Sequence, residues 1–414
     1  MTLIRDKNLA PQGLKKIEWA KEHMPVLQEL HKDLLEHKPF KGLNIAICIH
    51  LEAKTAYMAL VFQGGGARVV ITGSNPLSTQ DDVAAALAGE GVEVYALHGA
   101  TPQEYNECLY RTAETKPQLI IDDGGDLVSL LHKSFSQDIP GIIGGAEETT
   151  TGLNRLRAME KEKALGFPMI AVNDALCKHL FDNRYGTGQS AWDGIMRSTN
   201  LIVAGKNVVV IGYGWCGKGV AMRAKGLGAK VIICEVDPVR ALEAHMDGFH
   251  VLSLLEAAPQ GDIFITVTGC SKVLRSEHFM LMKNRALLAN AGHFDIEIDK
   301  QSLAELTGPP QQVRQNVEAY TFPDGRCLYL LGEGRLVNLA AADGHPVEIM
   351  DMSFGLQVLA LRYLLRKKGR LENRVLPLPP ELDQEVAWLK LKALQINIDA
   401  LTTEQKAYLE SWDF

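Results

Sequence analysis

The sequence predicts an α/β protein that contains two doubly wound parallel sheets of the Rossmann type. Two series of short apolar runs, at residues 43–121 and 207–290, alternate with helical stretches. This alternation is typical of a parallel sheet with helices on both faces. A glycine-rich turn follows the first strand of the second series, as it does in dinucleotide-binding domains. A chain of 414 residues is long enough for two or three domains.

Each element follows from the spacing of its apolar residues. Ahead of the first series, Leu14–Lys38 is expected to be helical, because apolar residues recur there at three- and four-residue intervals. The first series is expected to form strands at 43–49, 67–72, 92–97 and 119–121, with helices at 55–63, 81–89 and 105–113. The second series is expected to form strands at 207–211, 230–234, 263–267 and 286–290. Lys178–Thr199 joins the two series as a helical candidate hinge.

The last part of the chain is predicted to be helical. Val347–Lys367 has a helical pattern, and a proline-rich linker follows at Pro377–Pro380. An amphipathic stretch, Leu382–Leu409, comes after the linker. We expect it to form a small helical segment beside the two sheets.

Composition excludes several classes of protein. A net charge of −7 argues against partners such as nucleic acid or an anionic membrane. No apolar run reaches the roughly 18 residues that a membrane span needs, and residues 1–10 lack the apolar core of a signal peptide. Seven cysteines are scattered without metal-type pairs or a disulfide framework. The sequence therefore predicts free thiols, a cytoplasmic protein and no metal site.

Residues 208–219 carry the strongest single motif, an apolar strand followed by three spaced glycines and a helical stretch. Gly212 permits the tight turn, Gly214 lets a pyrophosphate approach the backbone, and Gly217 allows close helix packing. Glu235 ends the next strand, where a carboxylate accepts hydrogen bonds from a ribose and repels a 2′-phosphate. The motif predicts NAD rather than NADP. The alternative is a packing turn that binds no ligand.

Several blocks in order give the chain its resemblance to the S-adenosylhomocysteine hydrolase family. The blocks are 121–127 (IDDGGDL), 147–152 (EETTTG), 172–174 (VND), 181–183 (FDN), 290–294 (NAGHF), 334–339 (GRLVNL) and 344–346 (GHP). The resemblance implies a substrate domain at 1–183, a NAD domain at 184–343, a return segment of the substrate domain at 344–380, and a C-terminal helical segment at 381–414. It also implies a homotetramer with one tightly bound NAD per subunit, recycled in every turnover.

The reaction that the resemblance implies is the reversible hydrolysis of S-adenosyl-L-homocysteine to adenosine and homocysteine. A thioether on a primary sugar carbon resists direct attack by water, because the thiolate is a reluctant leaving group. Oxidation of C3′ to a ketone acidifies the C4′ hydrogen, so that a base can expel the thiolate by elimination. Water then adds at C5′, and C3′ is reduced again. The cofactor supplies the redox chemistry, and the protein supplies positioning and proton transfer.

The resemblance also assigns roles to individual residues. Lys178 would deprotonate the 3′-hydroxyl, with Asp182 one helical turn later and Asn183 to position it. Asp123 would be the base at C4′, and His50 the acid/base at C5′. The remaining assignments are Glu148 and Thr149 on the ribose, His345 near the nucleobase, His293 at the cofactor–substrate junction, and Thr150, Thr151, Asn290 and Asn338 at the cofactor. Taken singly, Lys178–Asp182 could be a surface ion pair, His50 structural and Asp123 a helix cap.

The first departure from the family concerns the purine. The usual pattern after the first strand is His, apolar, Thr, x, Glu, Thr, whereas this chain has His50, Leu51, Glu52, Ala53, Lys54 and Thr55. Adenine offers a donor amino group at C6, while hypoxanthine offers an acceptor O6 and a donor N1–H. Lys54 presents only donors and Glu52 an acceptor, a pair that suits hypoxanthine if both face the base. S-inosyl-L-homocysteine is therefore an alternative substrate to the adenosyl compound that dominates the family.

Two further departures affect the cofactor. Thr187 stands where most relatives have a Cys that lies near the nicotinamide and tunes its redox poise, so the resemblance does not extend to that poise. The chain ends KAYLESWDF, and the Lys/Tyr tail of many relatives is not evident, which predicts faster NAD exchange. Two other functions are alternatives: an inactive NAD-binding scaffold, and an ordinary dehydrogenase that releases NADH.

Overall fold

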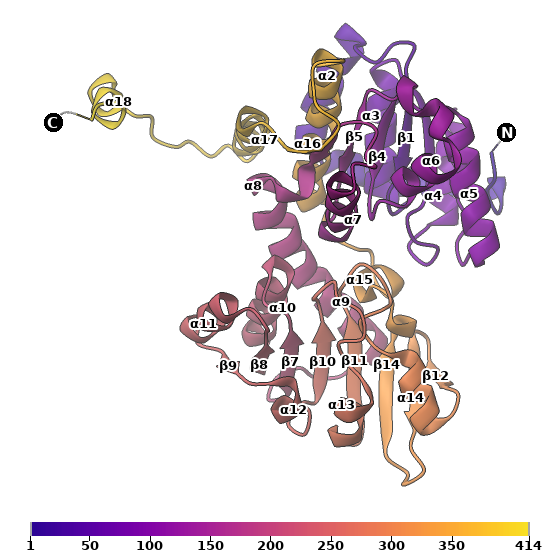
Figure 1. Ribbon diagram of the computed structural model, residues 1–414, viewed down its shortest axis with the longest axis vertical. Coiled ribbons are helices and arrows are strands. Elements are labelled where there is room, and N and C mark those ends of the chain that lie inside the picture. Colours follow the sequence, from indigo (N-terminus) through magenta and orange to yellow (C-terminus); the bar gives the residue numbers. More distant parts are fainter. Residues whose placement is uncertain (1, 413–414) are drawn as a thin grey trace.

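A computed structural model describes residues 2–412 and contains two sheets, each in its own lobe (Figure 1). The first sheet has seven parallel strands in the order β15-β6-β5-β4-β1-β2-β3. Its strands are β1 (Asn44–Cys48), β2 (Arg68–Thr72), β3 (Glu93–Tyr95), β4 (Leu119–Asp122), β5 (Gly144–Glu147), β6 (Met169–Ala171) and β15 (Val375–Pro377). The predicted strands of the first series are all present, while β5, β6 and β15 were not predicted.

The second sheet has eight strands in the order β12-β13-β14-β11-β10-β7-β8-β9. The strands are β7 (Asn207–Ile211), β8 (Lys230–Cys234), β9 (His250–Val251), β10 (Ile263–Thr266), β11 (Ala286–Asn290), β12 (Gln311–Arg314), β13 (Val317–Thr321) and β14 (Cys327–Leu331). β14 runs parallel to β11, and β13 and β12 are added to that edge in antiparallel fashion. The sheet is therefore mixed at one edge, where the sequence predicted parallel strands alone.

Helices cover both faces of each sheet. Around the first sheet lie α1 (Ala10–Glu22), α2 (Pro25–His37), α3 (Ala53–Gly64), α4 (Asp81–Gly89), α5 (Pro102–Glu114), α6 (Asp126–Ser134), α7 (Thr150–Lys161), α16 (Val347–Arg366) and α17 (Pro380–Ala393). Around the second lie α10 (Trp215–Gly226), α11 (Pro238–Met246), α12 (Leu254–Ala257), α13 (Ser276–Leu281), α14 (Lys300–Thr307) and α15 (Val337–Ala340). No helix among residues 2–412 combines the length and apolar character of a membrane span.

The chain crosses between the lobes twice. The first crossing is one continuous helical passage through α8 (Leu176–Lys178), a π-helix labelled η4 (His179–Gly186) and α9 (Thr187–Thr199). The return crossing follows α15 and leads into α16, after which β15 pairs with β6 and extends the first sheet. The second lobe is thus an insertion in the first.

The end of the chain is divided into two parts. α17 packs on α2 and α16, and the ammonium of Lys390 lies 2.9 Å from a carboxylate oxygen of Asp351 on α16. Gln395, with φ 56°, ends this helix in the left-handed region, and α18 (Thr403–Glu410) begins only at residue 403. The predicted single stretch Leu382–Leu409 is therefore two helices, and α18 lies away from both lobes (Figure 1).

Candidate active site

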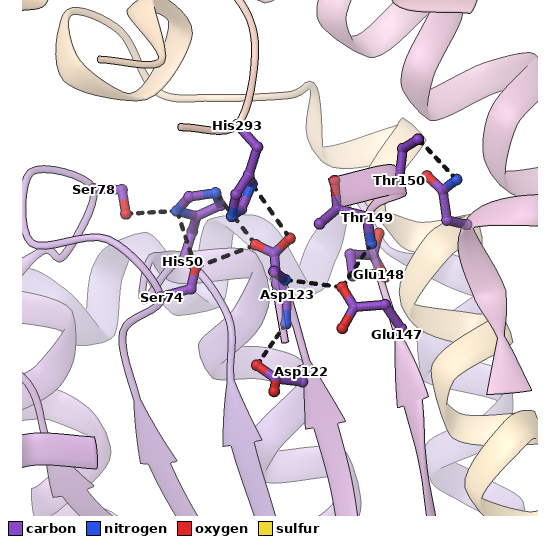
Figure 2. A network of polar contacts seen from close by, with 12 residues as sticks. His50, Ser74, Ser78, Asp122, Asp123, Glu147, Glu148, Thr149, Thr150 and His293 are labelled. Carbon is purple, nitrogen blue, oxygen red and sulfur yellow. Dashed lines mark hydrogen bonds and ion pairs between the residues drawn. The ribbon is translucent and has the colours of Figure 1, made fainter. Parts of the chain in front are cut away.

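Polar side chains gather where parallel strands of the first sheet end. His50 follows β1, Asp123 follows β4, and Glu148 follows β5. His293, which follows β11 of the second sheet, joins them from the other lobe (Figure 2). Ligands of open α/β sheets bind in the crevice at the carboxyl ends of the strands. The candidate site therefore lies between the lobes.

The first group of side chains is His50, Asp123 and His293. One carboxylate oxygen of Asp123 lies 3.3 Å from Nε2 of His50, and the other lies 3.7 Å from Nδ1 of His293. The hydroxyl of Ser78 lies 2.7 Å from Nδ1 of His50, and Ser74 donates to Asp123 at 3.2 Å. The ligand atoms of the three residues lie within 4.8 Å of one another, a spacing that could also hold a metal ion.

Burial decides the charge of His50. It lowers the pKa of this imidazole to about 4, although the neighbouring carboxylate of Asp123 acts in the opposite direction. His50 is therefore neutral near pH 7, so its ring carries one donor nitrogen and one acceptor nitrogen. A neutral imidazole can accept a proton, and it can pass on a proton that the neighbouring carboxyl group gives it.

Two buried carboxyl groups hold the turn that presents Asp123. Asp122 accepts hydrogen bonds from the backbone N–H groups of Asp123 and Val128, and Glu147 accepts from that of Gly124 at 2.8 Å (Figure 2). Gly124 has φ +110°, and a Cβ there would lie 2.6 Å from Nε2 of His293, so only glycine fits. Burial raises the pKa of Asp122 to about 7. Asp122 and Glu147, like Ser74 and Ser78, were not among the predicted site residues.

The second group of side chains surrounds Lys178 at the first crossing. Its ammonium donates to the side-chain oxygen of Asn183 at 2.8 Å and lies 3.3 Å from Asp182 and 3.4 Å from Glu148. Burial alone would lower the pKa of Lys178, but Asp182 and Glu148 outweigh it and raise that pKa. The wider turns of the π-helix bring Asp182 and Asn183 to one side of the lysine.

Glu148 is held from the other side by α16. Gln357 donates to one of its carboxylate oxygens at 2.5 Å, and the second oxygen is buried without a hydrogen bond among the described residues. Burial raises the pKa of Glu148 to about 7, although Lys178 lowers it. An orphaned buried oxygen beside Lys178 suits a hydroxyl of a bound sugar. Polar residues in the otherwise apolar stretch 347–366, such as Ser353 and Gln357, were the signal that the sequence offered for this support.

Residues 149–151 lead from this group toward the other lobe. The backbone N–H of Thr149 donates to Glu147 at 3.1 Å, and the hydroxyl of Thr150 accepts from Asn173 at 3.0 Å (Figure 2). A Cβ built on Gly269 of the second lobe would lie 3.9 Å from the hydroxyl oxygen of Thr151. The start of α7 thus faces the second lobe, where the predicted cofactor contacts of Thr150 and Thr151 would be made.

The glycine-rich turn after β7 has the geometry of a nucleotide site. Gly212 has φ +103°, and a Cβ on Gly217 would lie 2.0 Å from the carbonyl oxygen of Gly212, so both positions require glycine. A Cβ on Gly214 would meet no protein atom closer than 3.8 Å, which leaves open space at the start of α10. Helix N-termini of this kind bind phosphate groups. The residues present therefore fit the pyrophosphate of NAD.

Glu235 closes the other end of the same site. It accepts hydrogen bonds from the backbone N–H groups of Tyr213, Val236 and Asp237, which fix the carboxylate at the end of β8. The remaining lone pairs of the carboxylate can accept from ribose hydroxyls. Its negative charge beside the turn favours NAD over a 2′-phosphorylated cofactor.

The two predicted asparagines differ in what they leave for a cofactor. Asn290 donates to the carbonyls of Gly292, Phe294 and Gly334 and accepts from Gly292, so it holds the turn that carries His293. Asn338 donates to Ser190 at 3.0 Å, and its side-chain oxygen is buried without a hydrogen bond among residues 2–412. That oxygen is free for a donor such as the carboxamide of a nicotinamide, whereas Asn290 supports the turn.

Glu52 and Lys54, the two residues that depart from the family pattern, lie at the N-terminus of α3. Glu52 accepts from the backbone N–H of Lys54 and caps the helix, and the two side chains form a buried ion pair at 2.8 Å. The hydroxyl of Thr55 donates to the carbonyl of His50 at 2.7 Å. Lys54 also donates to the carbonyl of Asp343 at 3.0 Å, next to the Gly344–Pro346 block. Thr55 and the pair thus join the backbone of His50 to the return crossing.

His345 contacts the lysine group rather than standing apart from it. Its Nδ1 lies 2.6 Å from the carboxylate of Asp182, and its Nε2 lies 3.2 Å from the hydroxyl of Thr187. Together with Lys178, Glu148 and Asn183, it completes a polar group at the junction of the two crossings. Of the residues predicted for the reaction, the structure brings His50, Asp123 and His293 into one group and Lys178, Asp182, Asn183 and Glu148 into the other.

Comparisons with known proteins find similar sequences over nearly the whole chain. A family model described as S-adenosyl-L-homocysteine hydrolase matches residues 2–140, and one described as S-adenosyl-L-homocysteine hydrolase, NAD binding domain matches residues 183–344. An adenosylhomocysteinase of Pyrococcus abyssi is 59% identical over 409 residues, which is 99% of this chain and 97% of the relative. An S-inosyl-L-homocysteine hydrolase of Methanocaldococcus jannaschii is also 59% identical, over 99% of this chain and 98% of the relative. Relatives of either name are therefore equally similar.

Proposed function

Because the chain belongs to the S-adenosyl-L-homocysteine hydrolase family and is a NAD-dependent hydrolase, we propose that it reversibly cleaves the thioether of a purine nucleosyl-homocysteine. The observation that carries this proposal is the pairing of two proton-transfer groups in one site. One group is centred on Lys178, and the other on Asp123. Oxidation at C3′ needs a base in the Lys178 group, and elimination across C4′ and C5′ needs a second base in the Asp123 group. An inactive scaffold would have no need to keep them assembled.

Lys178 takes the proton of the 3′-hydroxyl, and the orphaned oxygen of Glu148 accepts a hydrogen bond from a ribose hydroxyl. The glycine-rich turn after β7 and Glu235 would hold NAD, which would supply the redox chemistry at C3′. Asp123 removes the proton from C4′, which expels homocysteine thiolate from C5′. The proton that Asp123 takes from C4′ passes through His50, which is neutral near pH 7, to the thiolate. His50 then takes a proton from the water that adds at C5′, and that proton returns through Asp123 to C4′. His293 closes this group from the second lobe.

The purine is the part of the substrate for which this chain departs from the family pattern. We favour hypoxanthine, and the supporting observation is Lys54. Its ammonium has three hydrogens, two of which are directed to Glu52 and to the carbonyl of Asp343. The third hydrogen suits the acceptor O6 of hypoxanthine. In adenine, the amino group at C6 is itself a donor and cannot accept this hydrogen.

The kinetic test compares S-inosyl-L-homocysteine with S-adenosyl-L-homocysteine on the same protein. Discrimination through a buried hydrogen-bonding group is expected to favour the inosyl compound at least about 10-fold in kcat/KM. Lys54→Gln, whose amide can accept from the adenine amino group, should narrow that ratio. Preference for the adenosyl compound would identify the chain as an adenosylhomocysteinase. Net release of NADH with no homocysteine formed would contradict the hydrolase reaction and indicate a dehydrogenase.

The active form is proposed to be a homotetramer in which the arm formed by residues 394–412 contacts another subunit. Apolar side chains along this arm are exposed, among them Ile396, Ile398, Leu409 and Trp412. An exposed apolar strip of this kind is typical of an interaction surface.

Light scattering of the whole chain is expected to give four times the chain mass of 45.5 kDa. Leu409→Asp combined with Trp412→Asp should lower the assembled mass, because each change places a charge in the proposed contact. The matched control, Glu404→Lys combined with Glu410→Lys, alters charged positions of the same helix and should leave the mass unchanged. A tetramer that withstands the apolar double variant would refute the role of the arm.

The proposed compartment is the cytoplasm. All seven cysteines lie within the described residues, and all are free thiols. Free thiols persist where glutathione and thioredoxin keep proteins reduced.

A further inference from the structure

Lys178 must lose a proton to act as a base, although its surroundings favour the charged form. The two neighbouring carboxylates of Asp182 and Glu148 raise its pKa despite burial. How strongly the two carboxylates stabilise the charged form of Lys178 depends on which other groups they contact. For Asp182 the structure gives two further partners, and one of them connects to the second lobe.

Both oxygens of Asp182 lie close to groups other than the lysine. Ser353 donates to Oδ2 at 2.6 Å, the same oxygen that lies 3.3 Å from the ammonium of Lys178. Nδ1 of His345 lies 2.6 Å from Oδ1. Oδ1 makes no well-aligned hydrogen bond among the described residues, so its contact with His345 is a close electrostatic approach, while Oδ2 is fixed by Ser353. A carboxylate that is shared with other polar groups holds a lysine proton less tightly.

The imidazole of His345 is itself held by the start of α9. Its Nε2 lies 3.2 Å from the hydroxyl of Thr187, and that hydroxyl donates to the thiol sulfur of Cys216 at 3.5 Å. With the ring hydrogen on Nδ1, facing the carboxylate of Asp182, Nε2 is an acceptor, and the one hydrogen of the Thr187 hydroxyl is directed either to Nε2 or to the thiol sulfur of Cys216. When it is directed to Nε2, the Thr187 oxygen can accept from the S–H of Cys216. Cys216 lies in the first turn of α10, inside the glycine-rich motif.

The backbone leaves room for this ring. A Cβ on Gly186 would lie 3.0 Å from both Cγ and Nδ1 of His345, so an alanine there would push against the ring. The imidazole ring thus packs against Gly186, with the hydroxyl of Thr187 at Nε2 and the carboxylate of Asp182 at Nδ1. None of these contacts involves the predicted nucleobase role of His345.

We propose that Thr187 and His345 are positioning residues that connect Cys216 of the cofactor-binding helix to Lys178 through Asp182. The chain of contacts holds Asp182 where it orients the lysine without retaining its proton. It also makes the orientation of the base depend on the second lobe, because Cys216 belongs to that lobe and Lys178 to the first crossing. This inference rests on the proposed reaction, in which Lys178 receives the 3′-hydroxyl proton.

The variants that test the chain are Thr187→Val and Thr187→Ser. Valine keeps the shape of threonine but removes the hydroxyl, while serine restores it. Thr187→Val is expected to slow oxidation of the bound nucleoside, followed at 340 nm, about 10-fold, and Thr187→Ser to stay within about 2-fold of the unchanged protein. KM and the Kd for NAD, measured by fluorescence titration, are expected to change less than about 2-fold in both, as is usual for loss of an interaction that acts only in the transition state.

Two further variants separate a positioning role from a structural one. Thr199→Val, on the same helix, removes a hydroxyl that donates to the carbonyl of Ile195 and accepts from the backbone N–H of Leu201, and it should leave the oxidation rate unchanged. Cys216→Ala should slow oxidation, and Cys216→Ser, which again offers an acceptor, should restore it.

The result that overturns the inference is equal slowing by Thr187→Val and Thr187→Ser, or a Thr187→Val effect confined to the Kd for NAD or to Tm. An unchanged oxidation rate in Thr187→Val also overturns it. If the unaltered protein oxidises no nucleoside and cleaves no nucleosyl-homocysteine, the proposed function fails instead, and the two failures are distinguishable from the first measurement.

Discussion

Lys178→Met is expected to lower kcat by about 10³-fold while the protein still binds NAD, because it removes the base for the first proton transfer. Methionine fills a similar volume but carries no proton acceptor. The loss should appear in the first half-reaction, so that adding a nucleoside produces no rise in absorbance at 340 nm. Stopped-flow absorbance measures this step directly. Normal oxidation of the nucleoside in Lys178→Met would assign the 3′-hydroxyl proton to another group.

The chain offers a matched control for this substitution. Lys390, on α17, is also buried, and its ammonium lies 2.9 Å from Asp351 and donates to the carbonyl of Glu348, so neither of these contacts involves Lys178, Asp182 or Glu148. Lys390→Met leaves the carboxylate of Asp351 without its cation and is expected to lower Tm. Its rate of nucleoside oxidation should remain normal below the melting temperature. A comparable rate loss in both variants would show that the effect comes from the loss of a buried ion pair and not from chemistry.

Asp123→Asn is expected to lower overall turnover by about 10²- to 10⁴-fold for a different reason. The Lys178 group is untouched, so oxidation at C3′ should proceed and absorbance at 340 nm should rise and persist. The C4′ proton has no base, so homocysteine release should stop. An amide cannot take up this proton, although it still fits between His50 and His293.

Hydrogen exchange at C4′ gives the sharpest measurement of this second prediction. In deuterated water the unaltered protein should exchange the C4′ hydrogen of a bound nucleoside, followed by NMR, and Asp123→Asn should not. The same sample of Asp123→Asn must still show the 340 nm signal, which serves as the internal control. Exchange at the normal rate would remove Asp123 from the role of base at C4′.

Much of the fold was predictable because its signals are local. The four expected strands of each series lie where the apolar runs placed them, and the glycine-rich turn joins β7 to α10 as its spacing requires. The comparisons confirm the family, the fold class and NAD as cofactor. Roles of individual site residues stay predictions, although their side chains meet in two groups.

The parts that were not predicted lack local signals. β5 is Gly-Gly-Ala-Glu, with no β-branched residue, and forms a strand because β4 and β6 lie on either side of it. β12 is exposed along its whole length and depends on pairing with β13. The contacts of Ser353 with Asp182 and of Gln357 with Glu148 join residues 171 and 209 positions apart, a separation that no spacing rule covers.

The two crossings between the lobes meet side by side, since Thr187 on the outgoing passage touches His345 on the returning one. The two connections of the inserted lobe to the first lobe therefore lie next to each other. A short linker in place of residues 188–344 would join them, and the seven strands of the first sheet would keep all their neighbours. The architecture thus records how a nucleotide-binding unit can be spliced into an existing α/β protein without disturbing the host sheet, and it marks the place where such a unit could be exchanged by design.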